Sequence, residues 1–238
     1  MLEIDRPMGI IPACDVPIGK ISKVAEATTD IQNISALKIG GITALEYGLA
    51  DVIETVKDYN DGIPIIFDYQ KAGNDIPDMG QLFAETVYSA GADAVIIFPF
   101  AGIKTEKSWI RACQDAGLIV YVGGHMTHPG FLAKDGGFIS DPSLIYQIAA
   151  EMGVQRFVVP GNHPELVRKY RQLLTSGVPG GKFRLVAPGF LTQGGNISET
   201  GLEAGPCWDA IIGRAITRHD SVADMRTAII QMIKQISQ

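Results

Sequence analysis

Short apolar runs alternate with amphipathic segments along the whole chain. Each run is rich in Val, Ile and Phe, is punctuated by Gly, Pro or Asp, and is followed by a segment with helical periodicity. Eight such runs lie at 9–16, 36–40, 64–69, 93–100, 118–125, 156–161, 183–189 and 210–216. Because they are continuously apolar rather than alternating, they predict strands that are covered on both faces, as in a parallel sheet.

The segments between the runs predict helices, most clearly at 77–90, 140–152 and 220–236. Pro77 and Pro142 each follow an aspartate closely, which is typical of a first helical turn. Strand followed by helix eight times predicts a (β/α)8 TIM barrel with right-handed crossovers. A doubly wound open sheet is the alternative, but its dinucleotide fingerprint is missing. Nothing resembling a linker divides the chain, so we expect residues 1–238 to form a single domain.

Composition narrows the ligands that such a fold could bind. The chain has 238 residues, of which 46% are hydrophobic, and a net charge of −6 at pH 7. This composition suits a large packed core. The chain has no cluster of Lys and Arg, which argues against broad binding to nucleic acid or to an anionic membrane. An anionic ligand must therefore be bound by a few groups at one site rather than by an extended basic surface.

The cysteines and the N-terminus indicate the compartment. Cys14, Cys113 and Cys207 are odd in number and have no CxxC spacing, so they predict neither a disulfide framework nor a thiolate metal site, and we expect reduced core residues. Residues 1–15 do not have the basic and then apolar pattern of a signal peptide, and no apolar run reaches the length of a membrane span. The sequence predicts a cytoplasmic protein.

In a (β/α)8 barrel the working residues stand at the C-terminal ends of the strands, so the polar residues that close the apolar runs are the candidates. These are Asp15, Lys38, Asp68, Lys71, Asp75, Thr127, His128, Gln193 and Arg214. His125 and His128 could suggest a metal pair, but no third ligand has suitable spacing, and we expect no metal.

The segments after the last two strands predict a phosphate site. Pro188 and Gly189 begin a glycine-rich stretch whose backbone N–H groups could approach an anion, and Gln193 adds an amide donor. Gly213 and Arg214 close the eighth run with a permanently charged guanidinium. Barrels of this kind often bind phosphate after strands seven and eight. The alternative is an ordinary surface loop with a charge at its rim.

Lys38, Asp68, Lys71 and Asp75 form a second signal. A lysine at a strand end in an apolar barrel mouth must be paired, and the aspartates are near enough in sequence to pair with the lysines. Such an array could orient charge around a substrate atom. A structural ring of ion pairs is the alternative, and Asp15 could be only a strand-end cap.

Seven further motifs stand in order along the chain: CDV at 14–16, LKIG at 37–40, DYQKAGNDIP at 68–77, HMTHPG at 125–130, VPGNHPE at 159–165, APGFLTQGG at 187–195 and GRAI at 213–216. Together they resemble the archaeal branch of the orotidine 5'-phosphate decarboxylase family. The match covers almost the whole chain. The resemblance implies a homodimer that decarboxylates orotidine 5'-phosphate without a metal or an organic cofactor.

The resemblance also implies a role for each matched residue. Asp15 would bind a ribose hydroxyl, and Lys38 and Asp68 would face the substrate carboxylate. Lys71 would protonate C6 as carbon dioxide leaves, and Asp75 would reach into the partner's active site. Thr127 would meet the pyrimidine edge, and Gln193 with Arg214 would bind the phosphate.

Some positions depart from the family's pattern. The family's central motif is D-x-K-x-x-D-I-P, whereas one extra residue separates Asp68 from Lys71 and another separates Lys71 from Asp75. We expect a bulge to absorb the first insertion and Gly73 to help with the second. Met79 stands where a small polar residue is common, and the usual serines are replaced at Thr127 and Ala215.

Two other functions remain open at this point. One is a metal-dependent keto-sugar-phosphate decarboxylase or aldolase of the same superfamily, although Lys38 stands where those enzymes typically have an acidic residue. The other is a non-catalytic protein that binds a phosphoribosyl ligand and whose displaced central motif no longer works. Retention of all four charged residues argues against that second alternative.

Overall fold

Eight parallel strands form the centre of this computed structural model, which describes residues 2–190 and 197–236. The strands are β1 (Gly9–Pro12), β2 (Leu37–Gly40), β3 (Ile65–Asp68), β4 (Ala94–Ile97), β5 (Ile119–Gly123), β6 (Arg156–Val158), β7 (Arg184–Ala187) and β8 (Trp208–Ile212). Their order in the sheet is β1-β8-β7-β6-β5-β4-β3-β2. Bridges join the β1 segment to the β2 segment, and the Cys14 N–H donates to the Lys38 carbonyl at 2.8 Å. These contacts close the barrel, which confirms the predicted fold.

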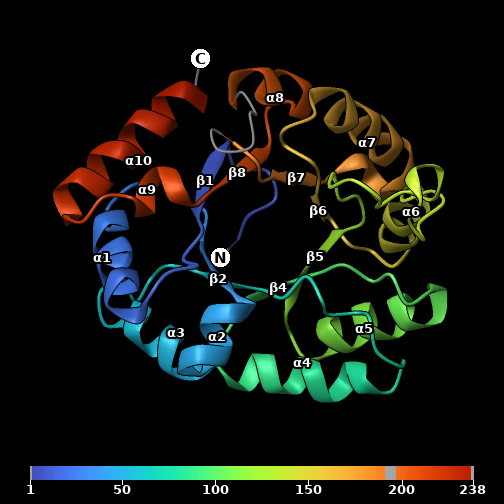
Figure 1. Ribbon diagram of the computed structural model, residues 1–238, viewed down its shortest axis with the longest axis horizontal. Helices are drawn as coiled ribbons and strands as arrows, with labels where there is room; N and C mark the ends of the chain where they lie inside the picture. The colour runs from blue at the N-terminus through green and yellow to red at the C-terminus, as the bar shows by residue number, and fades with distance from the viewer. Residues whose placement is uncertain (1, 191–196, 237–238) are drawn as a thin grey trace.

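Helices surround the barrel as an outer ring (Figure 1). They are α1 (Ile18–Thr28), α2 (Gly41–Tyr47), α3 (Leu49–Lys57), α4 (Met79–Ser89), α5 (Ile103–Asp115), α6 (Ser143–Glu151), α7 (Pro164–Gly177), α8 (Ile197–Ala204), α9 (Arg214–Thr217) and α10 (Val222–Ile236). Short 3-10 turns occur at η1 (Ala133–Asp135) and η2 (Pro179–Gly181). The three helices predicted most clearly correspond to α4, α6 and α10, each beginning two or three residues later than expected.

The eighth apolar run differs from its prediction. The pattern predicts a strand at 210–216, but β8 covers Trp208–Ile212 and the end of the run forms α9. Gly213 has φ −101° and ψ −96°, which ends the strand, and its carbonyl then accepts hydrogen bonds from the Ile216 and Thr217 N–H groups. Ile216 is fully buried in the helix. The apolar run therefore continues from a strand into a helix, and the hydrophobic pattern alone does not reveal where the backbone conformation changes.

Two apolar clusters lie on opposite faces of the strands. One fills the space between strands and helices and includes Ile65 and Phe67 of β3. The other fills the inside of the barrel and includes Ile66 of the same strand and Ile11 of β1. Both faces are covered, as the continuous apolar runs predict. Alternate residues of a strand face the barrel interior, and this alternation decides which side chains reach the cavity described below.

The N-terminal ends of the strands hold a buried charge network that is separate from that cavity. Arg184 at the start of β7 contacts both carboxylate oxygens of Asp209 on β8, at 2.5 and 2.8 Å. Its guanidinium also donates to the carbonyls of Arg6 and Pro7, at 2.7 and 2.9 Å. In Figure 1 the N-terminus accordingly lies near the centre of the ring of strands. This network ties the first residues of the chain to that end of the barrel.

The cysteines are unpaired. Cys14 and Cys113 are buried as expected, whereas Cys207 is partly exposed and is not a core residue. Among the described residues, no helix is both long enough and apolar enough to cross a membrane.

Candidate active site

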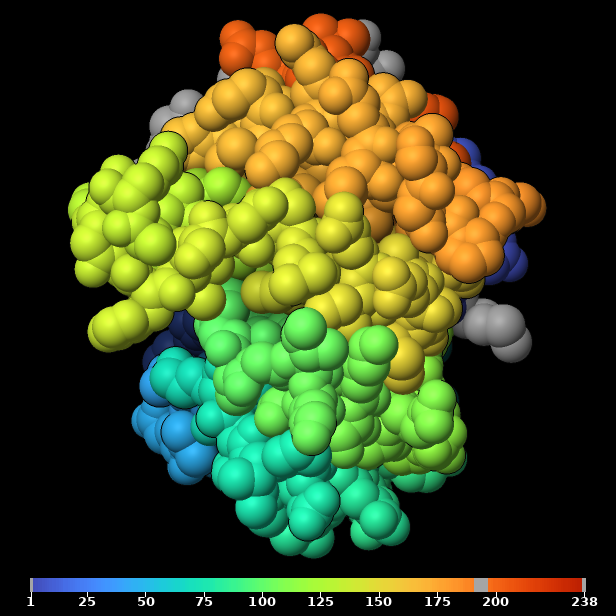
Figure 2. Space-filling model, turned by 90° about the vertical axis from the view of Figure 1, so that its right-hand side faces the viewer, coloured from blue at the N-terminus to red at the C-terminus, as the bar shows by residue number. Residues whose placement is uncertain are grey.

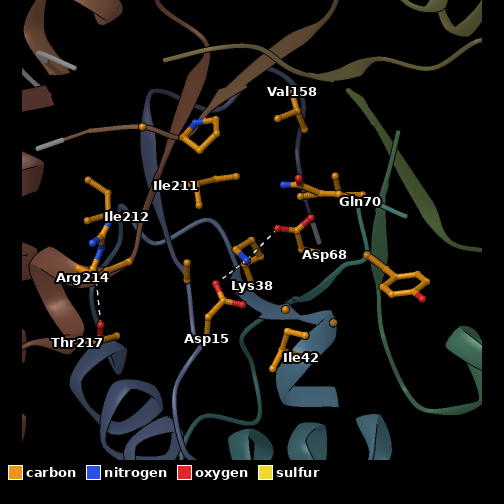
Figure 3. A pocket seen from close by; sticks show the side chains of 18 of the residues that line it. Asp15, Lys38, Ile42, Asp68, Gln70, Val158, Ile211, Ile212, Arg214 and Thr217 are labelled. Carbon is orange, nitrogen blue, oxygen red and sulfur yellow. Dashed lines mark hydrogen bonds and ion pairs between the residues drawn. The ribbon is translucent and has the colours of Figure 1, made fainter. Parts of the chain in front are cut away.

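A cavity of about 590 Å³ opens among residues that follow the C-terminal ends of the strands. Its lining comes from segments far apart in the sequence, at the ends of β1, β2, β3, β7 and β8. Among the predicted site residues, the lining includes Asp15, Lys38, Asp68, Lys71, Pro188, Gly189, Gly213 and Arg214. The barrel thus brings most of the candidates to one place. Figure 3 shows this cavity from close by.

Lys38 stands at the centre of the charged side of the cavity. Its side chain points inward from β2, and its Nζ lies 2.8 Å from Asp68 Oδ2 and 3.0 Å from Asp15 Oδ2 (Figure 3). Lys38 is only 5% exposed, which explains why it needs carboxylate partners. The predicted pairing of Lys38 with Asp68 is therefore present, and Asp15 adds a second partner that the sequence argument did not assign to it.

The electrostatics of this triad favour the charged form of Lys38. Burial by itself lowers the pKa of Lys38, but the carboxylates of Asp68 and Asp15 outweigh burial and raise that pKa above its usual value. Lys38 is therefore a fixed positive charge near neutral pH. The Asp68 side chain is 9% exposed, and its Oδ1 has no hydrogen-bond partner among the described residues. A buried acceptor in that state is available to a donor on a ligand or on a neighbouring side chain.

Lys71 reaches the same cavity from a turn rather than from a strand. β3 ends at Asp68, and the Ala72 N–H donates to the Tyr69 carbonyl at 2.8 Å, which closes a turn over residues 69–72. The expected bulge is therefore wrong: the inserted residue lies beyond the strand, where a turn accommodates it without changing the register. Gly73 then has φ +87°, a conformation that glycine adopts readily.

Asp75 does not line the cavity of its own chain. It is exposed, and its Oδ1 accepts a hydrogen bond from the adjacent Ile76 N–H at 2.7 Å. The backbone at this point is held by α5, because Thr105 Oγ1 donates to the Asp75 carbonyl and Trp109 Nε1 to the Ile76 carbonyl, both at 3.1 Å. Three of the four charged residues thus lie together, and Asp75 stands apart on a well-anchored loop.

The predicted phosphate residues lie across the cavity from Asp68. Pro188 and Gly189 follow β7, and Gly213 and Arg214 follow β8. In Figure 3 Arg214 and Asp68 stand on opposite sides, with Lys38 and Asp15 between them. Gln193, the predicted amide donor, lies outside the described residues. The cavity therefore offers a guanidinium at one side and ammonium and carboxylate groups at the other, which suits an elongated polar anion.

Thr127 is exposed on the segment 124–142, outside the cavity lining. Figure 2 shows this segment, in lime, projecting beyond the helical layer. Its base is held by side chains of α6 and α7: Tyr146 Oη accepts the His125 N–H at 3.2 Å, and Tyr170 Oη lies 2.8 Å from His125 Nδ1. Burial, followed by the charge of Lys169, lowers the pKa of His125, so the imidazole is neutral near pH 7. His125 is therefore an anchor of the segment.

Several lining residues have no counterpart among the predicted ones. Gln70 lies between Asp68 and Lys71 in the sequence, and Figure 3 shows its side chain above the Asp68 carboxylate. Ile42 and Leu45 of α2 contribute an apolar wall, and they are 72% and 77% exposed. Gln70 stands between two predicted site residues just past the end of β3, and this position is a signal that the sequence contained. No pattern in the sequence indicated that Ile42 and Leu45 would line the cavity.

These features define a class: a (β/α)8-barrel protein with a charged cavity at the C-terminal ends of its strands. More specifically, the chain belongs to the orotidine 5'-phosphate decarboxylase / HUMPS family, whose model matches residues 8–228. Among curated proteins, the orotidine 5'-phosphate decarboxylase of Methanosarcina barkeri is 33% identical over 202 residues, covering 84% of this chain and 82% of the relative. That of Pyrococcus abyssi is 34% identical over 195 residues, with coverage of 82% and 83%.

Solved structures agree with this family. The crystal structure of orotidine 5'-phosphate decarboxylase from Pyrococcus horikoshii has a TM-score of 0.74 and 29% identity, covering 94% of this chain and 99% of that one. The Methanocaldococcus jannaschii enzyme complexed with the inhibitor BMP has a TM-score of 0.81 and covers 98% and 100%. Because its identity is 20%, that second likeness concerns the fold.

Proposed function

We propose that this protein decarboxylates orotidine 5'-phosphate to uridine 5'-phosphate in de novo pyrimidine biosynthesis, in the cytoplasm and with no metal or organic cofactor. The observation that carries the proposal is the Asp15–Lys38–Asp68 triad, which shares its cavity with Lys71 and Arg214 in a chain of this family. Free cysteines agree with a reducing compartment.

The ligand would span the cavity. Arg214 binds the phosphate together with Gln193 and the backbone around Pro188, Gly189 and Gly213, because a guanidinium fork suits phosphate oxygens. Asp15 accepts a hydrogen bond from a ribose hydroxyl, and its 54% side-chain exposure leaves an oxygen for that contact. The pyrimidine then lies toward Asp68, and Thr127 meets its edge when the segment 124–142 approaches.

The chemistry requires one bond to break and one to form. The bond between C6 and the carboxylate carbon breaks, carbon dioxide leaves, and the electron pair stays on C6. Lys71 donates an ammonium proton to C6 and becomes a neutral amine. The developing negative charge at C6 is stabilised by the ammonium groups of Lys71 and Lys38, which the fold positions before the reaction begins. Binding energy from the remote phosphate offsets the cost of bringing the substrate carboxylate near Asp68.

The proposed assembly is a homodimer in which Asp75 of each chain reaches the other active site. Asp75 is exposed outside its own cavity and is flanked by the exposed apolar residues Ile76 and Met79, which are 60% and 37% exposed. Ile103 of α5, at 48% exposure, is a further exposed apolar residue, beside the helix contacts that hold the Asp75 loop. Exposed apolar residues close to a charged residue suit a surface between copies of the chain.

The proposal is tested by carbon dioxide release from orotidine 5'-phosphate with a chelator present. We expect turnover by the wild type, loss of turnover in Lys71→Ala with binding of uridine 5'-phosphate retained, and normal turnover in the control Lys234→Ala on α10. Mixing refolded Lys71→Ala and Asp75→Ala chains should restore about a quarter of the wild-type activity, since half of random dimers carry one complete site. An inactive wild type, or a strict need for magnesium, would contradict the proposal.

A further inference from the structure

Gln70 is the polar side chain that follows Asp68 into the cavity. It lines the cavity, and Figure 3 shows its amide directed toward the middle of the space, above the Asp68 carboxylate. Gln70 has no hydrogen bond to another described residue, so its two N–H donors and its carbonyl are available to a ligand. The residue is exposed and lies on the turn that borders the cavity.

The turn after β3 explains this position. Ile66 faces the inside of the barrel, and Asp68, two residues later, pairs with Lys38 at the cavity. β3 ends at Asp68, and the turn at 69–72 carries both Gln70 and Lys71, which line the cavity. A neutral amide therefore stands beside Asp68 in the cavity (Figure 3), in addition to the ammonium of Lys71.

The environment of Asp68 gives this amide a chemical role. Asp68 Oδ2 is paired with Lys38, whereas Oδ1 is buried without a partner among the described residues. An anionic group of a ligand placed next to Asp68 is repelled by the Asp68 carboxylate. Hydrogen-bond donors that lie between or beside these two negative groups reduce the repulsion. An amide supplies such donors without adding charge. A carboxylate of the same size at position 70 would instead add repulsion.

We propose that Gln70 contacts the carboxylate of the substrate and makes the cavity tolerant of an anionic group beside Asp68. This inference rests on the proposed function for the identity of that group. One amide N–H donates to the substrate carboxylate, and the other is free to donate to Asp68 Oδ1. Gln70 is thus a specificity-determining residue that distinguishes a ring bearing a carboxylate from the same ring without one.

The test compares two ligands that differ only in that carboxylate, orotidine 5'-phosphate and uridine 5'-phosphate. In Gln70→Glu, kcat/KM for orotidine 5'-phosphate should fall at least tenfold, because like charges a few ångströms apart repel strongly in a partly desolvated site. The inhibition constant of uridine 5'-phosphate should change less than threefold. The loss relative to wild type should shrink at pH 5, where the new carboxyl begins to be protonated.

Two further variants separate a contact from a general disturbance. Gln70→Met keeps the size and removes the donors, so it should also lower kcat/KM selectively but without the pH dependence. Gln231→Glu, on the exposed face of α10, adds the same charge far from the cavity and should leave both constants unchanged. Thermal melting of each variant shows whether it is folded. Equal losses for both ligands, or none, would overturn the assignment of Gln70.

Binding measurements keep this inference distinct from the proposed function. If the wild type fails to decarboxylate, calorimetry with both ligands still compares it with Gln70→Glu. Selective loss of orotidine 5'-phosphate binding in the variant would then retain the role of Gln70 and refute only the decarboxylase proposal. An active wild type whose Gln70→Glu variant keeps its full kcat/KM would refute only the role of Gln70.

Discussion

Replacing Lys38 with methionine would remove the positive charge at the centre of the site and keep most of the apolar stem. Lys38 is 5% exposed and its ammonium contacts Asp68 at 2.8 Å. In Lys38→Met the Asp68 carboxylate loses this partner, and its other oxygen already has none among the described residues. The variant therefore holds an unpaired carboxylate in a side chain that is only 9% exposed.

The magnitude of this effect follows from burial. Breaking a fully buried ion pair by removing one partner costs about 3–5 kcal/mol, and the position of Asp68 on the wall of a cavity reduces this to about 2–3 kcal/mol. The Asp15 contact adds less than about 1 kcal/mol because its side chain is 54% exposed. For a domain of this size, about 2–3 kcal/mol corresponds to a fall in Tm of about 4–12 °C.

Thermal unfolding followed by circular dichroism at pH 8 and at pH 5 measures this effect. The fall in Tm of Lys38→Met relative to wild type should be smaller at pH 5, because an unpaired buried carboxylate is less costly when it can take up a proton. Lys38 itself stays charged in the wild type over this range, so it adds no pH dependence of its own. Lys38→Met/Asp68→Asn should recover much of the loss. A fall in Tm below about 1 °C, or equal deficits at both pH values, would refute the reasoning.

Two other predictions concern groups on either side of the barrel. Glu106 of α5 is 1% exposed, and burial, opposed only by Lys107, raises its pKa to about 8. Its folded pKa is above the ordinary value of 4.5, so wild-type stability should fall as pH rises from about 4.5 to 8. Over that window the stability of Glu106→Gln, read from melting curves, should rise relative to wild type by up to about 5 kcal/mol. A difference in stability that stays constant with pH would contradict the burial argument. Arg214→Ala should weaken uridine 5'-phosphate binding about 10- to 100-fold in calorimetry and leave uridine binding within twofold, with Arg218→Ala as the control; equal losses for both ligands would place the phosphate elsewhere.

Much of the site could be anticipated because barrel geometry converts sequence position into spatial position. Once the strands are known, Asp15, Lys38 and Asp68 must meet at one end of the barrel, and so must the residues after β7 and β8. The pairing of Asp15 with Lys38 was not anticipated, because it depends on side-chain reach across neighbouring strands. The sequence pattern also could not predict which side chains around Lys71 face the cavity, because a turn past the end of a strand obeys no two-residue period.

The sequence by itself determined the fold class and the rows of residues that face the cavity. Continuous apolar runs separated by helical segments leave few ways to bury both faces of a strand, and alternation along β3 already places Ile66 and Asp68 in one row. Only the tertiary structure decided that Lys71 enters the cavity through a turn, that Asp75 lies outside it, and that β8 ends at Ile212. These outcomes depend on backbone dihedral angles at single residues and on long-range contacts, neither of which leaves a periodic trace in the sequence.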